Sequence, residues 1–287
     1  MYNKSNKKKI CAGIVLYNPK ENRLTENINA ILPQVSWLIL IDNASNNIAL
    51  ILNKWGNNPK IKIIRNFSNV GIAKALNQMC ETASLEKYEW ILTLDQDSVC
   101  PSNLIESFLR YTVYKNIGVV CPRFELNIEN LSLKKYTTDF EFVDYCITSA
   151  SLTNLCAWSK SGKFDEWMFI DCVDYDFCLK LKNIGYKIIR VNNVVINHEV
   201  GNPEKKRLFW GWEIVLHNHS PLRNYYISRN TIYILKKYWR NKSVYKWIPR
   251  LLYWQLCKLI FEKNKKQTFT SFINGCKDGL LCKIKNK

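Results

Sequence analysis

Two carboxylates, Asp95 and Asp97, follow the apolar run at residues 90–94. Side chains of an extended segment alternate with a period of two, so these two point to the same side. Converging carboxylates repel each other unless a cation lies between them, and oxygen ligands of this kind suit Mg²⁺ or Mn²⁺. Taken alone, the pair also fits a solvated turn whose Asp and Ser cap a helix. The rest of the chain must decide between these interpretations.

A second acidic segment contains Asp171, Asp174 and Asp176. A hydroxyl that attacks a substrate needs a general base to take its proton, and a second carboxylate about eighty residues after the metal pair suits that task. Asp174 also begins a helical pattern at residues 174–183, where acids in the first turn are favoured without any catalytic role. Both interpretations stay open from these residues alone.

Two further segments offer polar side chains. His198 follows an apolar stretch and could bind a metal through a ring nitrogen, although a histidine at a strand end is also a common surface residue. Arg223 and Arg229 could contact phosphates. The same segment equally fits a helix that begins at Ser220 and Pro221 and carries solvated basic residues.

The first hundred residues contain the elements that would position these side chains. Short apolar runs alternate with helical patterns: runs at 10–16, 37–41, 61–64 and 90–94, and helices at 24–35, 48–55 and 71–83. This alternation predicts a parallel, doubly wound sheet, in which ligands bind at the carboxyl ends of the strands. Tyr17, Asp42 and Asn69 fall at that edge together with Asp95. The chain lacks G-x-G-x-x-G after its first strand and lacks a P-loop.

Beyond Pro101 the pattern becomes mixed. We expect a helix at 101–114, strands at 118–121, 140–148, 151–158 and 186–191, and a helix at 174–183. After residue 218 tyrosine, tryptophan, lysine and arginine dominate, and Glu262 and Asp278 are the only acids from 236 onward. We therefore expect a catalytic domain at 1–218 and a basic helical region at 219–287, within which Pro249 divides residues 233–261 into two helices.

Composition narrows the class of protein. The net charge of +18 over 287 residues indicates an anionic partner. The eleven cysteines form no C-x-x-C pair and lie mostly in apolar runs, which favours a reducing compartment. No stretch is apolar for long enough to span a bilayer, and the apolar run after the basic N-terminus is too short for a signal peptide. These features predict a cytoplasmic protein.

Several segments together resemble the family-2 glycosyltransferases, in particular their bacterial rhamnosyltransferase-like branch. The resemblance runs from about Ile10 to Tyr233 and rests on segments 15–19, 41–45, 69–77, 94–98, 169–174, 185–186, His198 and 221–230. It implies the GT-A fold, which is α/β and Rossmann-like, with a mostly parallel central sheet flanked by helices. The order and spacing of the segments favour the metal interpretation of Asp95 and Asp97.

The resemblance also implies roles for single residues. Tyr17 would lie by the nucleotide base, Asp42 would hydrogen-bond a pyrimidine base, and Asn69 and Gly71 would line the nucleotide pocket. Asp95 and Asp97 would flank the metal and the donor sugar, with Asp97 the direct ligand, and His198 would be a later metal ligand. Arg223 would contact the nucleotide-sugar.

The acidic motif departs from the family pattern, because Val173 occupies the position of the usual glutamate. Either Asp171 or Asp174 could then be the catalytic base, and the spacing to the following helix favours Asp174. The implied chemistry is a single inverting displacement without a covalent enzyme intermediate, assisted by Mg²⁺ or Mn²⁺.

The resemblance predicts transfer of a sugar, L-rhamnose from dTDP-rhamnose, to a hydroxyl of a lipid-linked glycan in cell-surface polysaccharide biosynthesis. UDP-hexoses and UDP-galactofuranose are alternative donors. The basic, tryptophan-containing tail predicts peripheral binding at the anionic inner face of the cell membrane and not to nucleic acid. Two other functions stay open: a non-catalytic member that binds glycan or membrane, and a nucleotidyltransferase that releases pyrophosphate.

Overall fold

The computed structural model describes residues 10–125, 138–197, 204–207, 213–216, 219–261 and 264–284. These residues form two compact units. The first, which we call the sheet unit, comprises the described residues up to Trp167 and those from Val173 onward as far as residue 197. The second, the helical unit, comprises Met168–Cys172 and the described residues from 204 onward. The boundary at residue 218 that the composition suggests stays a prediction.

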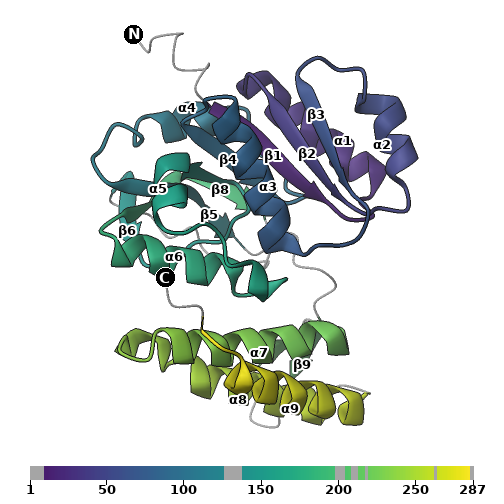
Figure 1. The fold of residues 1–287 in the computed structure, drawn as a ribbon, viewed down its shortest axis with the longest axis vertical. Helices are drawn as coiled ribbons and strands as arrows, with labels where there is room; N and C mark the ends of the chain where they lie inside the picture. The colour runs from purple at the N-terminus through teal and green to yellow at the C-terminus, as the bar shows by residue number, and fades with distance from the viewer. Residues whose placement is uncertain are drawn as a thin grey trace. The chain divides into compact units, whose positions relative to one another are not determined.

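The first half of the sheet unit is a parallel βα repeat (Figure 1). The strands β1 (Ile10–Leu16), β2 (Leu38–Asn43), β3 (Ile61–Asn66) and β4 (Trp90–Leu94) pair in parallel in the order β3-β2-β1-β4. The helices α1 (Glu21–Ile31), α2 (Ile48–Trp55) and α3 (Ile72–Leu85) connect them, with the short η2 (Leu32–Gln34) after α1. The alternation predicted from the apolar runs is confirmed.

The second half of the sheet is mixed. The strand β7 (Ser151–Asn154) runs antiparallel between β4 and β5 (Ile117–Glu125). The strand β8 (Lys187–Asn197) is parallel to β5, and β6 (Phe140–Val143) pairs antiparallel at the outer edge. The connecting helices are α4 (Leu104–Leu109), α5 (Leu155–Lys160), η3 (Glu166–Met168) and α6 (Val173–Asn183). Fold class and central sheet agree with the sequence prediction.

Three predicted elements in this half are shorter than expected. The strand predicted at 151–158 ends at Asn154, because the Asn154 side chain accepts a hydrogen bond from Ala157 N (3.0 Å) and begins α5. The strand predicted at 140–148 ends at Val143, where its pairing with β8 stops. The helix predicted at 101–114 is α4 alone, with turns on either side.

Aliphatic side chains fill the interior of the sheet unit. Ile14, Leu16, Ile28, Leu40 and Leu92 are completely buried, and each such side chain contributes roughly 1.5–3 kcal/mol relative to exposure. The helix α3 lies close against β1, because a Cβ added at Gly13 would lie 2.2 Å from the sulfur of Met79. The interior thus holds the strands rigidly beneath the edge at which they end.

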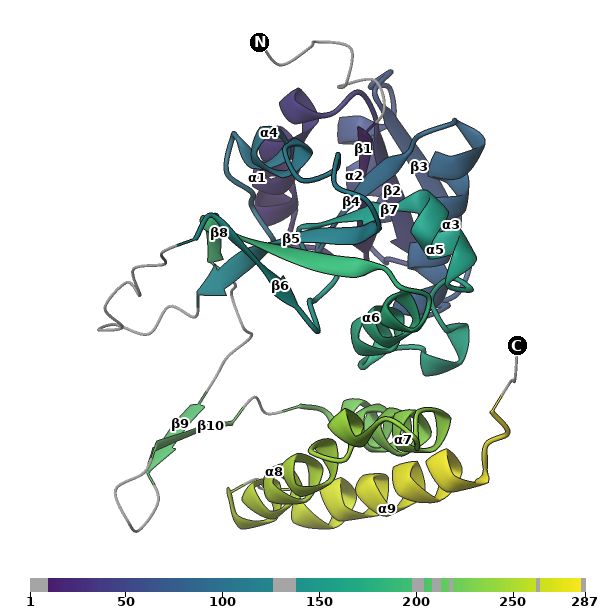
Figure 2. The same ribbon diagram turned by 90° about the vertical axis from the view of Figure 1, so that its left-hand side faces the viewer.

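The helical unit contains three long helices and a hairpin. The helices are α7 (Pro221–Lys237), α8 (Trp247–Phe261) and α9 (Lys265–Leu281), which lie alongside one another in Figure 2. The short η4 (Lys242–Val244) precedes α8, and the hairpin pairs β9 (Glu204–Arg207) with β10 (Glu213–Leu216). Within the described residues, no helix is both long and apolar enough to cross a membrane.

Two glycines let α9 approach α7 closely. A Cβ at Gly275 would lie 2.4 Å from Tyr225 O, and one at Gly279 would lie 2.6 Å from Arg229 O. Neither backbone atom can move away easily, so these positions require glycine. The sequence prediction of two helices within residues 233–261 is confirmed, but the break lies at residues 238–246 and not at Pro249. Pro249 lies in the first turn of α8, where its missing N–H is tolerated.

Candidate functional site

Polar residues follow the four parallel strands where each strand ends. Tyr17 follows β1, Asp42 lies near the end of β2, Asn69 lies beyond β3, and Asp95 follows β4. Because the strands are adjacent and parallel, their carboxyl ends meet at one edge of the sheet. The structure therefore brings these predicted site residues to the same side of the sheet unit.

The corner between β1 and β2 holds Asp42 in place. Asp42 is 1% exposed, and its Oδ1 accepts a hydrogen bond from Ser45 N (3.1 Å). Ser45 Oγ in turn accepts from Asn18 N (2.9 Å). Asn18 and Ala44 have positive φ angles of 48° and 66°, so both strands end in tight turns. The Tyr17 side chain beside this corner is 51% exposed and accessible to a ligand.

A network of side-chain amides connects the ends of β2 and β3 to the start of α3. Asn43 Nδ2 donates to Asn69 Oδ1 (2.8 Å), and Asn43 Oδ1 accepts from Val70 N (3.0 Å). Asn69 Oδ1 also accepts from Gly71 N (3.0 Å), and Gly71 adopts a φ of 84° that favours glycine. Asn69 and Gly71 are predicted site residues, and the sequence places Asn43 at the same edge without assigning it a role. Its position next to Asp42 was the available signal.

Gln96, the middle residue between the two carboxylates, joins their loop to the end of β1. Tyr17 N donates to Gln96 Oε1 (2.9 Å), and Gln96 Nε2 donates to Tyr17 O (3.3 Å). From α1, the buried Asn27 donates through Nδ2 to Asp95 O (2.7 Å). Neither role could be predicted from the residue types, because both contacts are made to backbone atoms distant in the chain.

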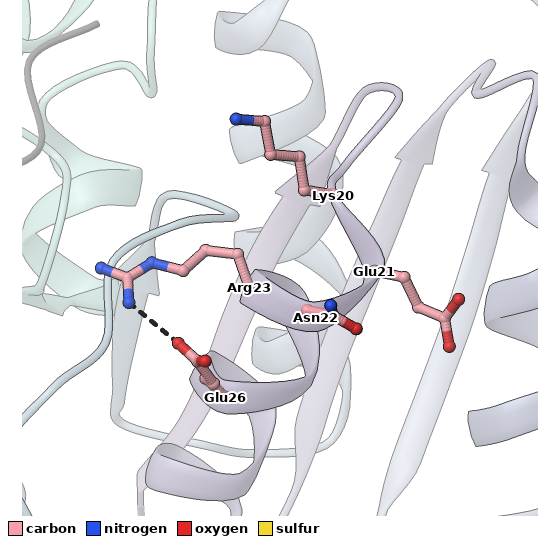
Figure 3. A pocket seen from close by; sticks show the side chains of 5 residues that line it. All are labelled: Lys20, Glu21, Asn22, Arg23 and Glu26. Carbon is pink, nitrogen blue, oxygen red and sulfur yellow. Dashed lines mark hydrogen bonds and ion pairs between the residues drawn. The ribbon is translucent and has the colours of Figure 1, made fainter.

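The loop also borders an open hollow at the start of α1, with a volume of about 580 Å³ (Figure 3). Lys20, Glu21, Asn22, Arg23 and Glu26 line it. Arg23 donates through Nε to Asp97 O (3.0 Å) and pairs through Nη1 with Glu26 (2.9 Å). The Asp97 side chain is exposed, and within the described ranges its carboxylate makes no hydrogen bond or ion pair. It is therefore available to a ligand.

The turn before β7 connects the Asp95–Asp97 loop to Asp174. Thr93 Oγ1 donates to Thr148 O (2.5 Å), and the hydroxyls of Ser98 and Ser149 lie 2.8 Å apart. Thr148 also lines a small internal cavity of about 10 Å³ together with Asp174. A cavity of that size holds about one water molecule. The loop and Asp174 thus contact the same turn within the sheet unit.

The Asp174 carboxylate lies in the first turn of α6, where Oδ1 accepts from Tyr175 N (2.9 Å). The cavity beside it also contains Cys146 and Cys178, whose sulfurs lie 3.8 Å apart. Hydrogen bonding to Cys121 and burial hold the pKa of the Cys146 thiol well above its usual value. Hydrogen bonding to Cys146 and burial do the same to the pKa of Cys178. These thiols stay protonated, so neither is a thiolate nucleophile.

Asp171 belongs to the helical unit, and its carboxylate is occupied by an arginine. Arg223 Nη2 lies 3.0 Å from Asp171 Oδ1, and Arg223 Nε donates to Oδ1 and Oδ2 at 3.3 and 3.2 Å. The Asp171 side chain is only 17% exposed. The two acids that the sequence left as alternatives therefore differ: Asp171 pairs with a guanidinium, whereas Asp174 lines a cavity.

Asn230 of α7 holds the backbone around Asp171. Its Nδ2 lies within hydrogen-bond distance of the carbonyl oxygens of Met168, Ile170 and Asp171, at 2.8, 2.7 and 2.9 Å. Phe169, Asp171 and Cys172 all have positive φ angles, a strained conformation that needs such support. In the sequence Asn230 belongs to the segment 221–230 that resembles the family, but no role was assigned to it. Its three backbone contacts could not be predicted from the residue type.

The predicted metal ligands can be tested only in part. His198 lies outside the described residues, and the described chain contains no cluster of three or more His, Cys, Asp or Glu side chains that could hold a metal. Asp95 and Asp97 nevertheless fit Mg²⁺ or Mn²⁺, because Mg²⁺ is usually held by one or two carboxylates, water and substrate phosphates. The exposed Asp97 carboxylate has the acceptor chemistry that such an ion requires.

Comparison with known proteins identifies the family. The model of "Glycosyl transferase family 2" matches residues 11–173, more than half of the chain. The "dTDP-rhamnosyl transferase RfbF" of Shigella flexneri is 29% identical over 245 residues, covering 79% of this chain and 80% of that protein. The family match includes the strand ends and the loop that carries Asp95 and Asp97.

Solved structures share the fold. GalNAc-T7 with UDP, GalNAc and Mn²⁺ aligns with a TM-score of 0.64 and 14% identity over 94% of this chain, which spans little more than half (56%) of that protein. S. aureus TarS 1–349 with UDP-GlcNAc gives 0.60 and 16%, covering 95% and 80% of the two chains. The mannosyltransferase PcManGT of Pyrobaculum calidifontis, with GDP-Man and Mn²⁺, gives 0.59 and 12%, covering 94% and 73%. With its GT-A fold, the chain belongs to glycosyl transferase family 2 and is a glycosyltransferase similar to a dTDP-rhamnosyl transferase.

Proposed function

We propose that this glycosyltransferase moves L-rhamnose from dTDP-rhamnose to a hydroxyl of a lipid-linked glycan, with inversion, in cell-surface polysaccharide biosynthesis. The similarity to a dTDP-rhamnosyl transferase over 79% of the chain supports the donor. The observation that carries the reaction is the shared edge of the sheet unit. There Asp42 and Asp97 lie at the ends of parallel strands, and Asp174 lines a cavity together with the turn that contacts the Asp95–Asp97 loop.

The β1 and β2 ends fit a nucleotide base. Asp42 Oδ1 is used by Ser45 N, which leaves Oδ2 as an acceptor for the ring N–H of a thymine or uracil base. Tyr17 offers an exposed ring beside it. Asn69 and Gly71 then line the nucleotide pocket at the start of α3. In this arrangement Gln96 aligns the base-binding corner with the carboxylate loop through its two bonds to Tyr17.

We assign a divalent cation, Mg²⁺ or Mn²⁺, to Asp95 and Asp97, with His198 as a predicted further ligand. The Mn²⁺ named in two structures of the same fold supports this assignment. When bound, the ion neutralises the negative charge of the departing nucleoside diphosphate. Arg223 stays a predicted diphosphate contact, and its Nη1 is not among the atoms that bind Asp171.

Asp174 is our choice as general base. Its carboxylate lines a cavity, whereas Asp171 would have to exchange its guanidinium partner before accepting a proton. In the reaction the acceptor oxygen attacks the anomeric carbon, its proton passes to Asp174, and the bond from that carbon to the diphosphate breaks. In this proposal Asp171 has a structural role. Arg223 binds its carboxylate and Asn230 binds its carbonyl oxygen, and both contacts hold the segment before α6 in place.

Charge supports the proposed acceptor and location. A net charge of +18 and a basic helical region suit a protein that works at the anionic inner face of the cell membrane, where lipid-linked acceptors reside. This places the protein at the membrane periphery and in contact with the cytoplasm. Nucleic acid is not part of the proposal, because no nucleic-acid-binding motif occurs.

The test is transfer by purified protein from dTDP-rhamnose, UDP-hexoses and UDP-galactofuranose, with Mg²⁺, Mn²⁺ or a chelator. Release of nucleoside diphosphate and of pyrophosphate is measured together with product. We expect dTDP release with dTDP-rhamnose and a divalent ion. We expect Asp97→Asn and Asp174→Asn each to lower transfer roughly 100-fold or more, whereas Asp171→Asn lowers it less.

The matched control is Glu86→Gln, an exposed carboxylate beyond the end of α3 that should leave transfer unchanged. Circular dichroism confirms that each variant is folded. Full activity of Asp97→Asn or Asp174→Asn would contradict the assigned roles. Pyrophosphate release would indicate the nucleotidyltransferase, and the absence of turnover with every donor would indicate a non-catalytic binding protein.

A further inference from the structure

The helix α8 presents an apolar stripe to its surroundings. Ile248, Leu252, Leu256 and Ile260 recur every four residues and are 39%, 54%, 58% and 52% exposed. Residues at this spacing lie on one side of a helix. In a helix at the surface of a water-soluble domain such a stripe faces the interior, whereas here it faces outward.

The inner side of α8 is only partly apolar, because its buried residues are Leu251, Gln255, Cys257 and Lys258. Gln255 and Lys258 are 4% and 7% exposed and meet Asn224 of α7. Gln255 exchanges two hydrogen bonds with Asn224, at 3.2 and 2.8 Å, and Lys258 Nζ donates to Asn224 Oδ1 (2.6 Å). Asn224 Nδ2 also donates to Thr268 O of α9 (3.0 Å). The interior between the three helices is therefore organised by hydrogen bonds.

The helix α9 repeats this arrangement. Phe269, Ile273 and Leu280 are 47%, 46% and 60% exposed, whereas its buried residues are Thr268 and the two glycines packed on α7. Small residues that bring helix backbones together, with apolar side chains outside, are typical of helices packed in an apolar medium. The medium that stabilises this surface should therefore itself be apolar.

Charge identifies the medium. From residue 236 to the end the sequence has fourteen Lys and Arg against two acids, and one of these, Asp278, accepts a hydrogen bond from Tyr225. Exposed Arg250 lies within α8 itself. Trp239, 60% exposed, carries the Arg240 guanidinium 5.0 Å from its ring centre. Apolar residues bordered by cations and tryptophan fit the headgroup boundary of an anionic bilayer.

We propose that α8 lies in the plane of an anionic phospholipid bilayer, with Ile248, Leu252, Leu256 and Ile260 inserted between the acyl chains. This goes beyond the charge attraction of the proposed function, because it names the inserted surface and predicts binding that persists in salt. It rests on the proposed function in one respect: the lipid-linked acceptor is the reason for the protein to bind a membrane. A second copy of the chain is the competing occupant of this stripe.

The test is co-sedimentation of the full-length protein with vesicles of phosphatidylcholine and phosphatidylglycerol in equal amounts, at low and at high salt. The variant is Leu252→Ser with Leu256→Ser. The matched control, Leu50→Ser with Leu85→Ser, changes two exposed leucines of the sheet unit that are 51% and 83% exposed. We expect the natural sequence and the control to bind at both salt concentrations. The variant should bind roughly tenfold or more weakly, with the residual binding lost in salt.

Two results would overturn the proposal: vesicle binding that is equal in the variant and the control, or no binding by the natural sequence. A stable dimer without lipid that the variant abolishes, measured by analytical ultracentrifugation, would assign the stripe to a second copy instead. Release of dTDP without vesicles is measured in parallel and should be unchanged in the variant. Its absence in all proteins would contradict the proposed reaction and leave the membrane result standing.

Discussion

Among the described residues, the sheet unit buries mostly apolar side chains, whereas the helical unit buries about as many polar side chains as apolar ones. In the sheet unit Ile14 and Leu40 are completely buried, and the polar groups gather at one edge. In the helical unit Asn224 and Ser228 are buried, at 1% and 0% exposure, whereas Leu256 is exposed. A hydrophobic content of 47% for the whole chain describes neither arrangement.

The contrast shows that the two units are stabilised by different interactions. The sheet unit gains free energy from removing aliphatic surface from water. The helical unit depends on close backbone contact at Gly275 and Gly279 and on hydrogen bonds around Asn224. Substitutions of the same chemical kind should therefore have different effects in the two units, which the following measurements check.

The largest expected effect is on a buried leucine of the sheet unit. Leu40→Ala should lower the free energy of unfolding by about 2–5 kcal/mol, because it leaves a cavity in the hydrophobic core of the sheet unit. Leu256→Ala, the same substitution on α8, should change it by no more than about 0.5 kcal/mol, because that side chain is exposed. Urea unfolding followed by circular dichroism measures both. Equal losses would mean that Leu256 packs within the folded protein.

A smaller effect is expected from the polar interior of the helical unit. Asn224→Ala removes the partner of Gln255 and Lys258 and should destabilise this unit by about 1–3 kcal/mol. Hydrogen exchange measured by mass spectrometry should show faster exchange in α7, α8 and α9, with β1 to β4 unchanged. Protection that stays the same in the three helices would show that the hydrogen bonds around Asn224 contribute little.

The smallest effect concerns cysteine reactivity. Burial raises the pKa of the Cys100 thiol to about 11, so at pH 8 it is protonated and unreactive. Burial likewise raises the pKa of Cys80, whereas Cys156 is exposed. Brief treatment of the native protein with iodoacetamide should therefore label Cys156 before Cys80 and Cys100. Raising the pH toward 11 should increase labelling of Cys100, and equal labelling at pH 8 would contradict the buried positions.

The sequence predicted the parallel half of the sheet because β1, β2 and β4 are apolar over most of their length, as strands buried on both faces are. It also located Tyr17, Asp42 and Asp95 at one edge, since parallel strands end together. It did not foresee that the strand after Ser151 ends at Asn154, because a side-chain cap competes there with residues of high strand propensity. The side-chain cap at Asn154 therefore outweighed the strand propensity of the residues that follow it.

Two features of the candidate site and the tail lay beyond sequence reasoning. Gln96 and Asn27 form hydrogen bonds with backbone atoms 79 and 68 residues away in the chain, and a residue type alone does not indicate such a partner. The spacing of the apolar residues along α8 predicts one apolar side and one more polar side. It does not show which side faces the interior of the protein, because the spacing is the same in both cases. The burial of Lys258 and the exposure of Leu256 determine that direction.

The reversed direction of β7 has a consequence for how this protein could diversify. Because β7 is antiparallel to its neighbours, its first residue, Ser151, pairs with Thr93 just before the carboxylate loop. The segment 144–150 therefore enters the reaction edge from the side, without forming part of the parallel ladder. The end of this segment nearest β7 is tied to β4 and its loop, because Thr148 and Ser149 hydrogen-bond Thr93 and Ser98, whereas Asp144 at the other end is exposed. Changes near Asp144 should therefore cost little folding stability, whereas changes at Ser149 should disturb the loop that carries Asp95 and Asp97.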